Sequence, residues 1–361
     1  MPYEGSQLDT GRLARAKTAF TARRVRLKEA VMLLNGNLTP SSGDLVLTRV
    51  EKIGHHQRLE LANGRRARLF VGDEVLVSYG HRYAPHQFEA VIPDGLDTCD
   101  LAAAGGIAAR VLSKHDKMKD PTKLAPLGLL GDIKGRPLNL GNFALKRLNR
   151  YPPRPLTLAV AGTAMDAGKT TTAASLIKGL TGSGLKVGAA KVTGTGAGGD
   201  LWFMKDAGGD PVLDFIDAGF PSTYRATPEQ IEDIASLLIS HLRNASVDAI
   251  VLEVSDGLYQ EETAGLLSSF VFRNSVDGII FAASDAMGAH AGVDWLWQLD
   301  LPVIALSGAL TSSPLAIREV QESIGLPVLR SKTLCGPSIA SIVESLLANQ
   351  RAAQSVSLRA V

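Results

Sequence analysis

Cysteine is scarce in this 361-residue sequence, which holds only Cys99 and Cys335, far apart and without a CxxC spacing. Neither a disulfide framework nor a cysteine metal site is therefore supported. The seven scattered histidines form no zinc motif with them. No run of about 18 apolar residues is long enough for a membrane span, and the first residues lack the apolar core of a secretion signal. We therefore expect a cytoplasmic protein without a membrane partner.

The charges are unevenly distributed along the chain. Residues 1–150 contain 24 lysines and arginines against 15 acidic residues, whereas residues 151–361 contain 14 against 21. This asymmetry predicts two differently built halves. The basic excess is spread out, and "RRVRLKEAVMLL" fits the solvated face of a helix, so nucleic acid is not an expected partner.

The first half predicts a helical segment at 1–42 and a β-rich domain at 43–150. An amphipathic helix is expected from about Thr10 to Leu34, ending near "NGN". Short alternating runs follow, two of them joined by Asn63-Gly64, a strong signal for a type I′ hairpin. We expect a small antiparallel barrel or sandwich, and a linker at 149–155, "NRYPPRP", because consecutive prolines resist helix and sheet.

The second half, residues 151–361, alternates apolar strands with helical patterns. Strands are expected at 156–162, 186–192, 249–255, 278–284 and 302–308, and a shorter one at 326–329. Near-continuous apolar strands between helices predict an α/β domain with a doubly wound, mostly parallel sheet. Ligands of such sheets bind at the carboxyl ends of the strands.

One such strand end carries the stretch "AVAGTAMDAGKTTT", residues 159–172. Gly168, Lys169 and Thr170 supply the last three positions of the phosphate-loop pattern GxxxxGK[ST], in which backbone N–H groups wrap phosphates, the lysine reaches the β and γ phosphates and the hydroxyl ligates Mg²⁺. Thr163 stands where the first glycine belongs, and Gly162 comes one residue early. The predicted nucleotide-binding residues of this loop are Gly162, Thr163, Ala164, Met165, Ala167, Gly168, Lys169, Thr170 and Thr171.

The loop and four further segments resemble dethiobiotin synthetase and the cobyrinic acid amide synthases. "AAKVTGTGAGGD" is similar to their lysine and aspartate segment, and "VLEVSDGL" to their acidic motif at a later strand end. "SDAMGAHAG" and "LSGALTSSP" follow in the same order. The resemblance implies that Lys191 faces the substrate or the γ-phosphate, that Asp200 and Glu253 join Thr170 in holding Mg²⁺, and that Ser307 and Gly308 belong to the base-recognition loop.

Several acidic residues compete for these roles. Asp206 and Asp256 are alternatives to Asp200 as the second metal carboxylate, and Asp210 also lies near that position in the sequence. Asp166, inside the loop, either orients an attacking group near the γ-phosphate or stabilises the loop by bonding backbone N–H groups. With Lys169 and Lys191, it completes the set of candidate catalytic residues.

A polar stretch at 214–230, "DFIDAGFPSTYRATPEQ", allows two interpretations. Residues 221–225 line a substrate pocket in which Arg225 pairs with an acid group, or Thr227 and Gln230 simply form a capping box for the helix at 228. His81 and His86 with Tyr83 form either a ligand rim or solvated loops.

These features lead to one functional expectation and two alternatives. We expect an enzyme that uses ATP and Mg²⁺ to phosphorylate or activate a small acidic or amino-acid-like acceptor, a kinase or ligase, acting as a homodimer. The chain also resembles a less characterised group of P-loop proteins with an extra N-terminal domain, which includes N-acyltransferases of D-glutamate catabolism. The alternatives are thus an acyltransferase that binds coenzyme A phosphates in the loop and a nucleotide switch of the metallochaperone type.

Overall fold

The computed structural model describes residues 3–148 and 152–357, so residues 149–151 of the predicted linker lie outside the described residues. The chain divides into two compact units. The first contains Met1–Lys146 together with Gly194–Gly199 and Phe215–Arg225. The second contains Arg147–Thr193, Asp200–Asp214 and Ala226–Val361.

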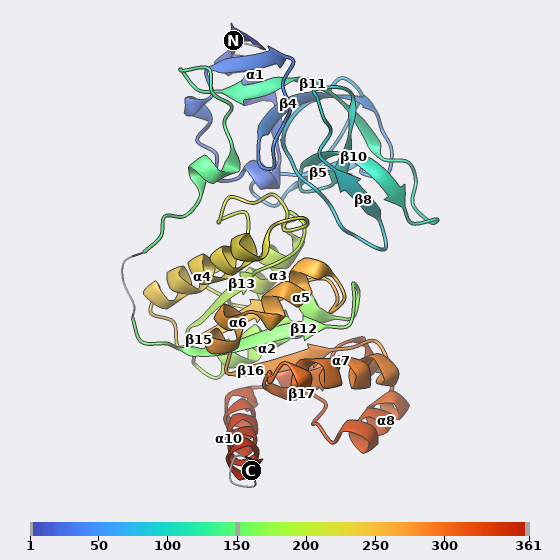
Figure 1. Ribbon diagram of the computed structural model, residues 1–361, viewed down its shortest axis with the longest axis vertical. Coiled ribbons are helices and arrows are strands. Elements are labelled where there is room, and N and C mark those ends of the chain that lie inside the picture. The colour runs from blue at the N-terminus through green and yellow to red at the C-terminus, as the bar shows by residue number, and fades with distance from the viewer. Residues whose placement is uncertain (1–2, 149–151, 358–361) are drawn as a thin grey trace. The chain divides into compact units, whose positions relative to one another are not determined.

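The first unit is built on a nine-stranded sheet (blue to green in Figure 1). β4 (Leu45–Lys52) pairs with β7 (Glu74–Tyr79), β7 with β10 (Ile107–Lys114), β10 with β9 (Cys99–Ala103), β9 with β11 (Thr122–Gly131), and β11 again with β4. The pairings of these five strands close on themselves, which removes open edges from the barrel. Leucine, valine and tyrosine side chains fill it, among them Val46, Val77, Tyr79 and Leu101. β8 (Phe88–Val91) pairs with β10 outside this ring.

The N-terminal segment differs from the long helix that the sequence predicts. Only α1 (Thr10–Arg15) is an α-helix; β2 (Lys17–Thr18), the 3-10 turns η1 (Phe20–Ala22) and η2 (Leu27–Glu29) and β3 (Met32–Gly36) follow it. β3 lies between β1 (Tyr3–Gln7) and β11 in the sheet. Leu33 and Leu34 are both buried, as neighbours on one strand can be when both faces are covered. Tertiary pairing therefore overrode the helical spacing of the apolar residues.

The predicted hairpin at Asn63-Gly64 is present, between β5 (Arg58–Glu60) and β6 (Arg66–Arg68). A type I′ turn requires positive φ at both central residues. Here only Gly64 has positive φ, at 84°, so the turn is not type I′. Leu61 N–H donates to Arg65 O at 2.9 Å, so three residues form the loop. A left-handed glycine that ends such a loop is the usual form of three-residue hairpins.

The second unit contains a six-stranded, all-parallel sheet in the order β14 (Val212–Asp214), β13 (Val187–Lys191), β15 (Ala249–Glu253), β12 (Leu156–Gly162), β16 (Gly278–Ala282) and β17 (Val303–Ser307). The five long strands are those that the sequence predicts. The expected strand at 326–329 contributes only an isolated bridge from Val328 to Leu306. β14 was missed, because an apolar run of three residues is too short to recognise.

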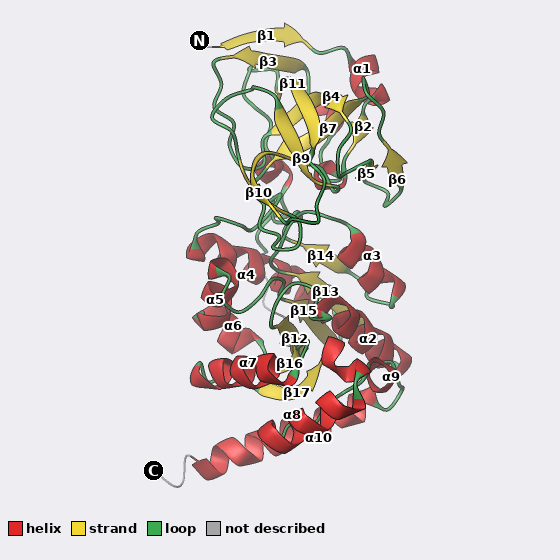
Figure 2. Ribbon diagram, turned by 90° about the vertical axis from the view of Figure 1, so that its right-hand side faces the viewer, coloured by secondary structure: helices red, strands yellow, loops and turns green. Residues whose placement is uncertain are grey.

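Helices cover both faces of this sheet. Figure 2 shows α4 (Pro228–Asn244), α5 (Glu261–Ser268), α6 (Phe270–Ser275) and α7 (Ala286–Gln298) on one side, and α2 (Lys169–Gly182) and α9 (Ser331–Leu334) on the other. α8 (Pro314–Ile324) contacts α7, and α10 (Ile339–Ser357) contacts α2 and β17. The burial of the sheet on both faces explains why its strands are mostly apolar.

Candidate functional site

The loop between β12 and α2 contains two residues in the left-handed conformation. Asp166 and Gly168 both adopt positive φ, at 66° and 92°, and Gly168 directly precedes the first residue of α2. The first N–H groups of a helix have no partner within the helix and carry positive potential. Alternating backbone conformations that turn successive N–H groups inward form an anion-binding nest.

The position of Gly162 accounts for the departure from the strict motif. A Cβ at Gly162 would lie 2.6 Å from Ala282 O and 2.8 Å from Cγ of Lys169. Thr163, which stands where the motif has glycine, is half-buried, and its N–H donates to Ala282 O at 3.0 Å. The glycine is needed at the last residue of the strand, where the lysine side chain passes over the backbone.

Lys169 extends across the loop that it follows. Its Nζ donates to Ala164 O at 2.6 Å, and only 7% of the residue is exposed. Burial lowers the pKa of Lys169, and the carboxylates of Glu253 and Asp256 partly oppose that shift. A partly desolvated ammonium inside a nest of N–H groups gains most from an anionic ligand.

Three oxygen-bearing side chains converge beside the loop. Thr170 Oγ1 lies 2.7 Å from Glu253 Oε1 and 3.3 Å from Asp200 Oδ1. Glu253 ends β15, and Asp200 is the second residue of α3 (Gly199–Asp206). The structure thus brings together Thr170, the hydroxyl of the phosphate-loop pattern, and the two carboxylates that the resemblance assigns to Mg²⁺, which lie 30 and 83 residues away from it in the sequence.

Lys191 completes the cluster from the neighbouring strand. In the sheet it is aligned with Glu253, which is aligned in turn with Val160 of β12. Its Nζ donates to Asp200 Oδ2. Burial disfavours the charge of Lys191, but the carboxylates of Asp200 and Glu253 outweigh burial and raise the pKa of Lys191. Burial likewise disfavours the charge of Asp200, but the ion pair with Lys191 outweighs it and lowers the pKa of Asp200.

Glu253 is the carboxyl group of the cluster whose ionised form is disfavoured. It is 1% exposed, and its Oε2 has no hydrogen-bond partner among the described residues. Burial and the neighbouring Asp200 raise the pKa of Glu253 to about 7, against the opposing effect of Lys191. A buried, unsatisfied carboxylate oxygen is costly unless a proton or a cation meets it.

The donor set fits Mg²⁺. No group of three or more histidine, cysteine or acidic side chains that could hold a metal occurs in the described part of the chain, but Mg²⁺ usually binds one or two carboxylates and keeps several waters. Thr170, Asp200 and Glu253 offer a hydroxyl and two carboxylates, and the orphaned Oε2 of Glu253 is an oxygen that a cation would satisfy.

The competing acidic residues lie in different places. Asp206, at the end of α3, and Asp210 are exposed, and the structure gives neither a bond to Thr170. Asp256 is half-buried with φ of 62°; its charge opposes the lowering of the Lys169 pKa and adds to the raising of the Lys191 pKa, so it belongs to the charge environment of the site. Asp166 is exposed in the loop. The geometry therefore favours Asp200 as the second carboxylate.

Ser307 and Gly308 lie behind the loop. Ser307 is 1% exposed; its Oγ donates to Leu329 O at 2.8 Å and lies 3.3 Å from the Thr172 hydroxyl of α2. A Cβ at Gly308, where φ is 95°, would lie 2.4 Å from Ala167 O. Gly308 therefore packs closely against the loop, whereas Ser307 is buried between α2 and Leu329.

The stretch at 215–225 belongs to the first unit, and Thr227 and Gln230 form the predicted capping box of α4. Thr223 is buried, and Tyr224 packs against the rings of Tyr83 and His81, at centroid distances of 5.6 and 6.5 Å. The structure thus joins two of the three rim residues to Tyr224. His86 instead meets the ring of His115 edge to face, at a centroid distance of 6.0 Å.

One residue near the cluster escaped the sequence reasoning. Asp214, at the end of the short strand β14, is aligned with Lys191 and is 2% exposed. The signal that could have revealed it is an aspartate directly after an apolar run, "PVLD", which marks the carboxyl end of a strand.

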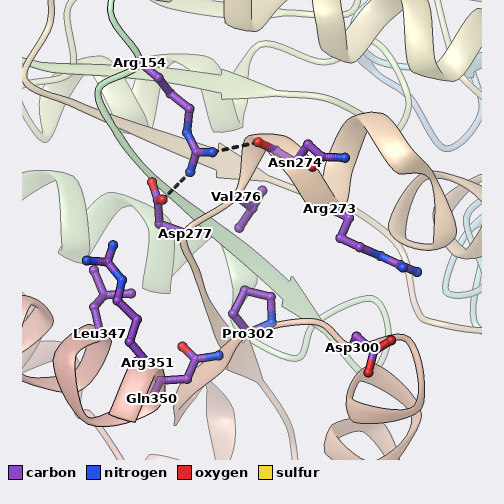
Figure 3. Close-up of a pocket in the computed structure, with 10 residues that line it drawn as sticks. All are labelled: Arg154, Arg273, Asn274, Val276, Asp277, Asp300, Pro302, Leu347, Gln350 and Arg351. Atoms are coloured by element: carbon purple, nitrogen blue, oxygen red, sulfur yellow. Dashed lines mark hydrogen bonds and ion pairs between the residues drawn. The ribbon is translucent and has the colours of Figure 1, made fainter. Parts of the chain in front are cut away.

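A hollow of about 290 Å³ lies at the other edge of the same sheet (Figure 3). Arg154 there donates to Asn274 O at 2.7 Å and to Asp277, and Figure 3 shows Arg273 directed away from that pair. Asp277 and Pro302 precede β16 and β17, whereas the phosphate loop follows the carboxyl end of β12. The hollow is therefore separate from the site.

No helix in residues 3–148 and 152–357 is long and apolar enough to cross a membrane. No protein-family model matches the sequence, and no curated protein matches it.

Solved structures match about half of the chain. Signal recognition particle receptor FtsY from Elizabethkingia anophelis, in complex with GDP, is 13% identical with a TM-score of 0.35, covering 50% of this chain and 58% of that one. The 54 kDa signal recognition particle protein from Aeropyrum pernix, in complex with GDP, is 17% identical with a TM-score of 0.38, covering 57% and 51%. FtsY from Thermotoga maritima is 18% identical with a TM-score of 0.34, covering 50% and 63%. This chain thus spans between about half and two thirds of those proteins, and the likeness is distant.

Proposed function

We propose that the second unit binds a nucleoside triphosphate, in the first place ATP, with Mg²⁺, and transfers its γ-phosphate to a small acceptor that carries an acid group. The observation that carries this proposal is the convergence of Lys169, Thr170, Lys191, Asp200 and Glu253 at the carboxyl edge of one parallel sheet. This edge is where open α/β sheets bind their ligands.

The basic residues and the oxygen donors of the site would have different roles. The loop N–H groups and Lys169 hold the phosphates, and Lys191 neutralises charge that spreads over the γ-phosphate oxygens during transfer. Thr170, Asp200 and Glu253 would hold Mg²⁺, which would offset the negative charge of the phosphates. A bound phosphate would compete with Asp200 for Lys191, and a cation would satisfy the orphaned oxygen of Glu253.

When the acceptor is a carboxylate, the transfer needs no general base, because the attacking oxygen carries no proton. A carboxylate oxygen forms a bond to the γ phosphorus, while the bond from that phosphorus to the oxygen bridging the β and γ phosphates breaks and ADP leaves. The acylphosphate so formed is either the product of a kinase or, after attack by an amine with loss of phosphate, the intermediate of a ligase. The resemblance to dethiobiotin synthetase supports this acceptor chemistry over transfer to water.

Calorimetry on the full chain tests the proposal. ATP, GTP and acetyl-CoA are each titrated with and without Mg²⁺, and ADP and phosphate release are then followed with pools of amino and carboxylic acids. We expect Mg²⁺-enhanced binding of ATP and acid-stimulated ADP release. Binding of acetyl-CoA alone would favour the acyltransferase, acid-independent hydrolysis would favour a nucleotide switch, and no binding of any of the three ligands would refute the proposal.

A further inference from the structure

The segment Gly194–Gly199 belongs to the first unit, whereas the residues on both sides of it belong to the second. It joins Lys191 at the end of β13 to Asp200 in the first turn of α3. These are the two residues whose side chains form the ion pair of the site. The conformation of this short segment therefore bears directly on where the Asp200 carboxylate lies.

Its sequence, "GTGAGG", gives it little conformational preference of its own. Four of its six residues are glycines, and glycine loses more backbone freedom on ordering than any other residue. The order of the segment must therefore come from bonds to other parts of the chain. Without such bonds, Asp200 would follow a flexible backbone segment.

The bonds are present along the whole segment. At its start, Gly194 N–H donates to Thr223 Oγ1 at 2.8 Å, and Thr223 N–H donates to Gly194 O at 2.9 Å. In its middle, Gly196 N–H donates to Pro221 O at 2.9 Å. At its end, Gly198 N–H donates to Glu60 Oε2 at 2.8 Å.

The last of these bonds differs from the others because its acceptor is a buried carboxylate. Glu60 ends β5 and is 3% exposed. A buried carboxylate is expensive unless it is hydrogen-bonded, and an ionised acceptor makes a bond about twice as strong as a neutral one. Gly198 directly precedes α3, where the helix start also favours a negative charge.

We propose that Glu60 is a positioning residue for Asp200. By holding Gly198 N–H it fixes the first turn of α3, so that the Asp200 carboxylate stays against Thr170 and Lys191 despite the nearby carboxylate of Glu253. The proposal rests on the proposed function in one respect, that Asp200 serves Mg²⁺.

Magnesium titration of the full chain tests the functional part. The Kd of fluorescent ATP is measured at increasing Mg²⁺ for the native protein, Glu60→Ala and Glu60→Gln. We expect Glu60→Ala to need about three- to tenfold more Mg²⁺, somewhat less than a direct partner of a ligand would require, with an unchanged Kd in EDTA. Glu60→Gln keeps an acceptor oxygen and should stay within about twofold of the native protein. An unchanged magnesium requirement in Glu60→Ala would overturn the proposal.

Glu74→Ala is the matched control. Glu74 is a half-buried carboxylate of the first unit that accepts hydrogen bonds from Arg12 and Arg49. We expect Glu74→Ala to lower stability without changing the magnesium requirement. An equal rise in both alanine variants would mean that general loosening of the unit is the cause.

Amide hydrogen exchange provides a readout that does not depend on nucleotide. In Glu60→Ala, the amides from Gly198 to Trp202 should exchange faster, while those of β12 and β15 keep their native protection. If the native protein bound no nucleotide, the proposed function would fail, and this exchange pattern alone would decide the positioning role. Native protection at Gly198 to Trp202 in the alanine variant would overturn it. If that variant does not fold, Glu60→Gln is compared in the same way, with protection retained.

Discussion

The hydroxyl of Thr170 lies 2.7 Å from Oε1 of Glu253, joining the first turn of α2 to the end of β15. The two residues are 83 positions apart, and strand register brings them together, because Val160, two residues before the end of β12, is aligned with Glu253. The contact leaves Oε2 of the same carboxylate without a partner among the described residues. A cation held here would satisfy both oxygens.

Lys169→Ala should weaken ATP binding at least about tenfold, the equivalent of roughly 1.4 kcal/mol, because the ammonium at the mouth of the loop is the principal charge facing the phosphates. Isothermal calorimetry measures the loss, and thermal unfolding checks the fold. Lys178→Ala, an exposed lysine on the same helix, is the control and should bind normally. Equal affinities for both variants would contradict the assignment of Lys169.

Asp200→Asn and Asp206→Asn separate the candidate metal carboxylates. Asp200 lies 3.3 Å from the Thr170 hydroxyl, whereas Asp206 is exposed at the other end of α3. Asp200→Asn should raise the Mg²⁺ concentration needed for tight ATP binding about tenfold or more. Asp206→Asn should leave it unchanged, and the reverse result would transfer the metal role to Asp206.

The affinity for Mg²⁺ should depend on pH near neutrality. The pKa of Glu253 is raised to about 7 by burial and by Asp200, so its proton must leave before it can bind a cation. The apparent Mg²⁺ affinity should rise from about pH 6 to about pH 8. In Glu253→Gln this dependence should be flat, as measured by magnesium titration of fluorescent ATP; a native pH dependence in that variant would assign the proton to another group.

The same raised pKa predicts the stability of the metal-free protein. A carboxyl that binds its proton more tightly when folded contributes stability below its ordinary pKa of 4.5, and loses that contribution as the pH rises through about 7. Glu253→Gln removes the buried charge. It should therefore unfold at a higher temperature than the native protein at pH 8, with a smaller difference at pH 5. A larger advantage at pH 5 would contradict the sign of the shift.

Gly308→Ala should disturb the loop, and Gly325→Ala should not. Both positions have positive φ, at 95° and 75°, so alanine costs roughly 1–2 kcal/mol at either. Only at Gly308 would the new Cβ meet backbone, 2.4 Å from Ala167 O; at Gly325 nothing lies within 4 Å. Weaker ATP binding should occur in Gly308→Ala alone, measured by calorimetry. Similar losses in both variants would show that strain, and not the contact with the loop, matters.

Ser307→Ala distinguishes support of the loop from recognition of a base. Removing the hydroxyl deletes a buried bond to Leu329 O and leaves the Thr172 hydroxyl with one partner fewer. We expect a loss of about 1–2 kcal/mol in the free energy of unfolding, measured by denaturant titration, with ATP affinity within about twofold. A large change in the preference for ATP over GTP would instead support the base-recognition role.

Sequence patterns by themselves determined the α/β unit and its loop. Five buried strands, the helices between them and the Gly168-Lys169-Thr170 end of the motif are local signals, because apolar runs and helix caps act over a few residues. The confirmed capping box of Thr227 and Gln230 is of the same kind. The roles of Lys191, Asp200 and Glu253 remain predictions, although their order along the chain pointed to one sheet edge.

Tertiary structure alone decided the rest. The apolar spacing of residues 10–34 predicted a helix, but the pairing of β3 with β1 and β11 stabilised an extended backbone instead. The bond from Gly198 to Glu60 joins segments 138 residues apart, and no local pattern marks either end. Helix and strand periods report only which side of an element is buried, whereas contacts between distant segments depend on how the whole chain packs.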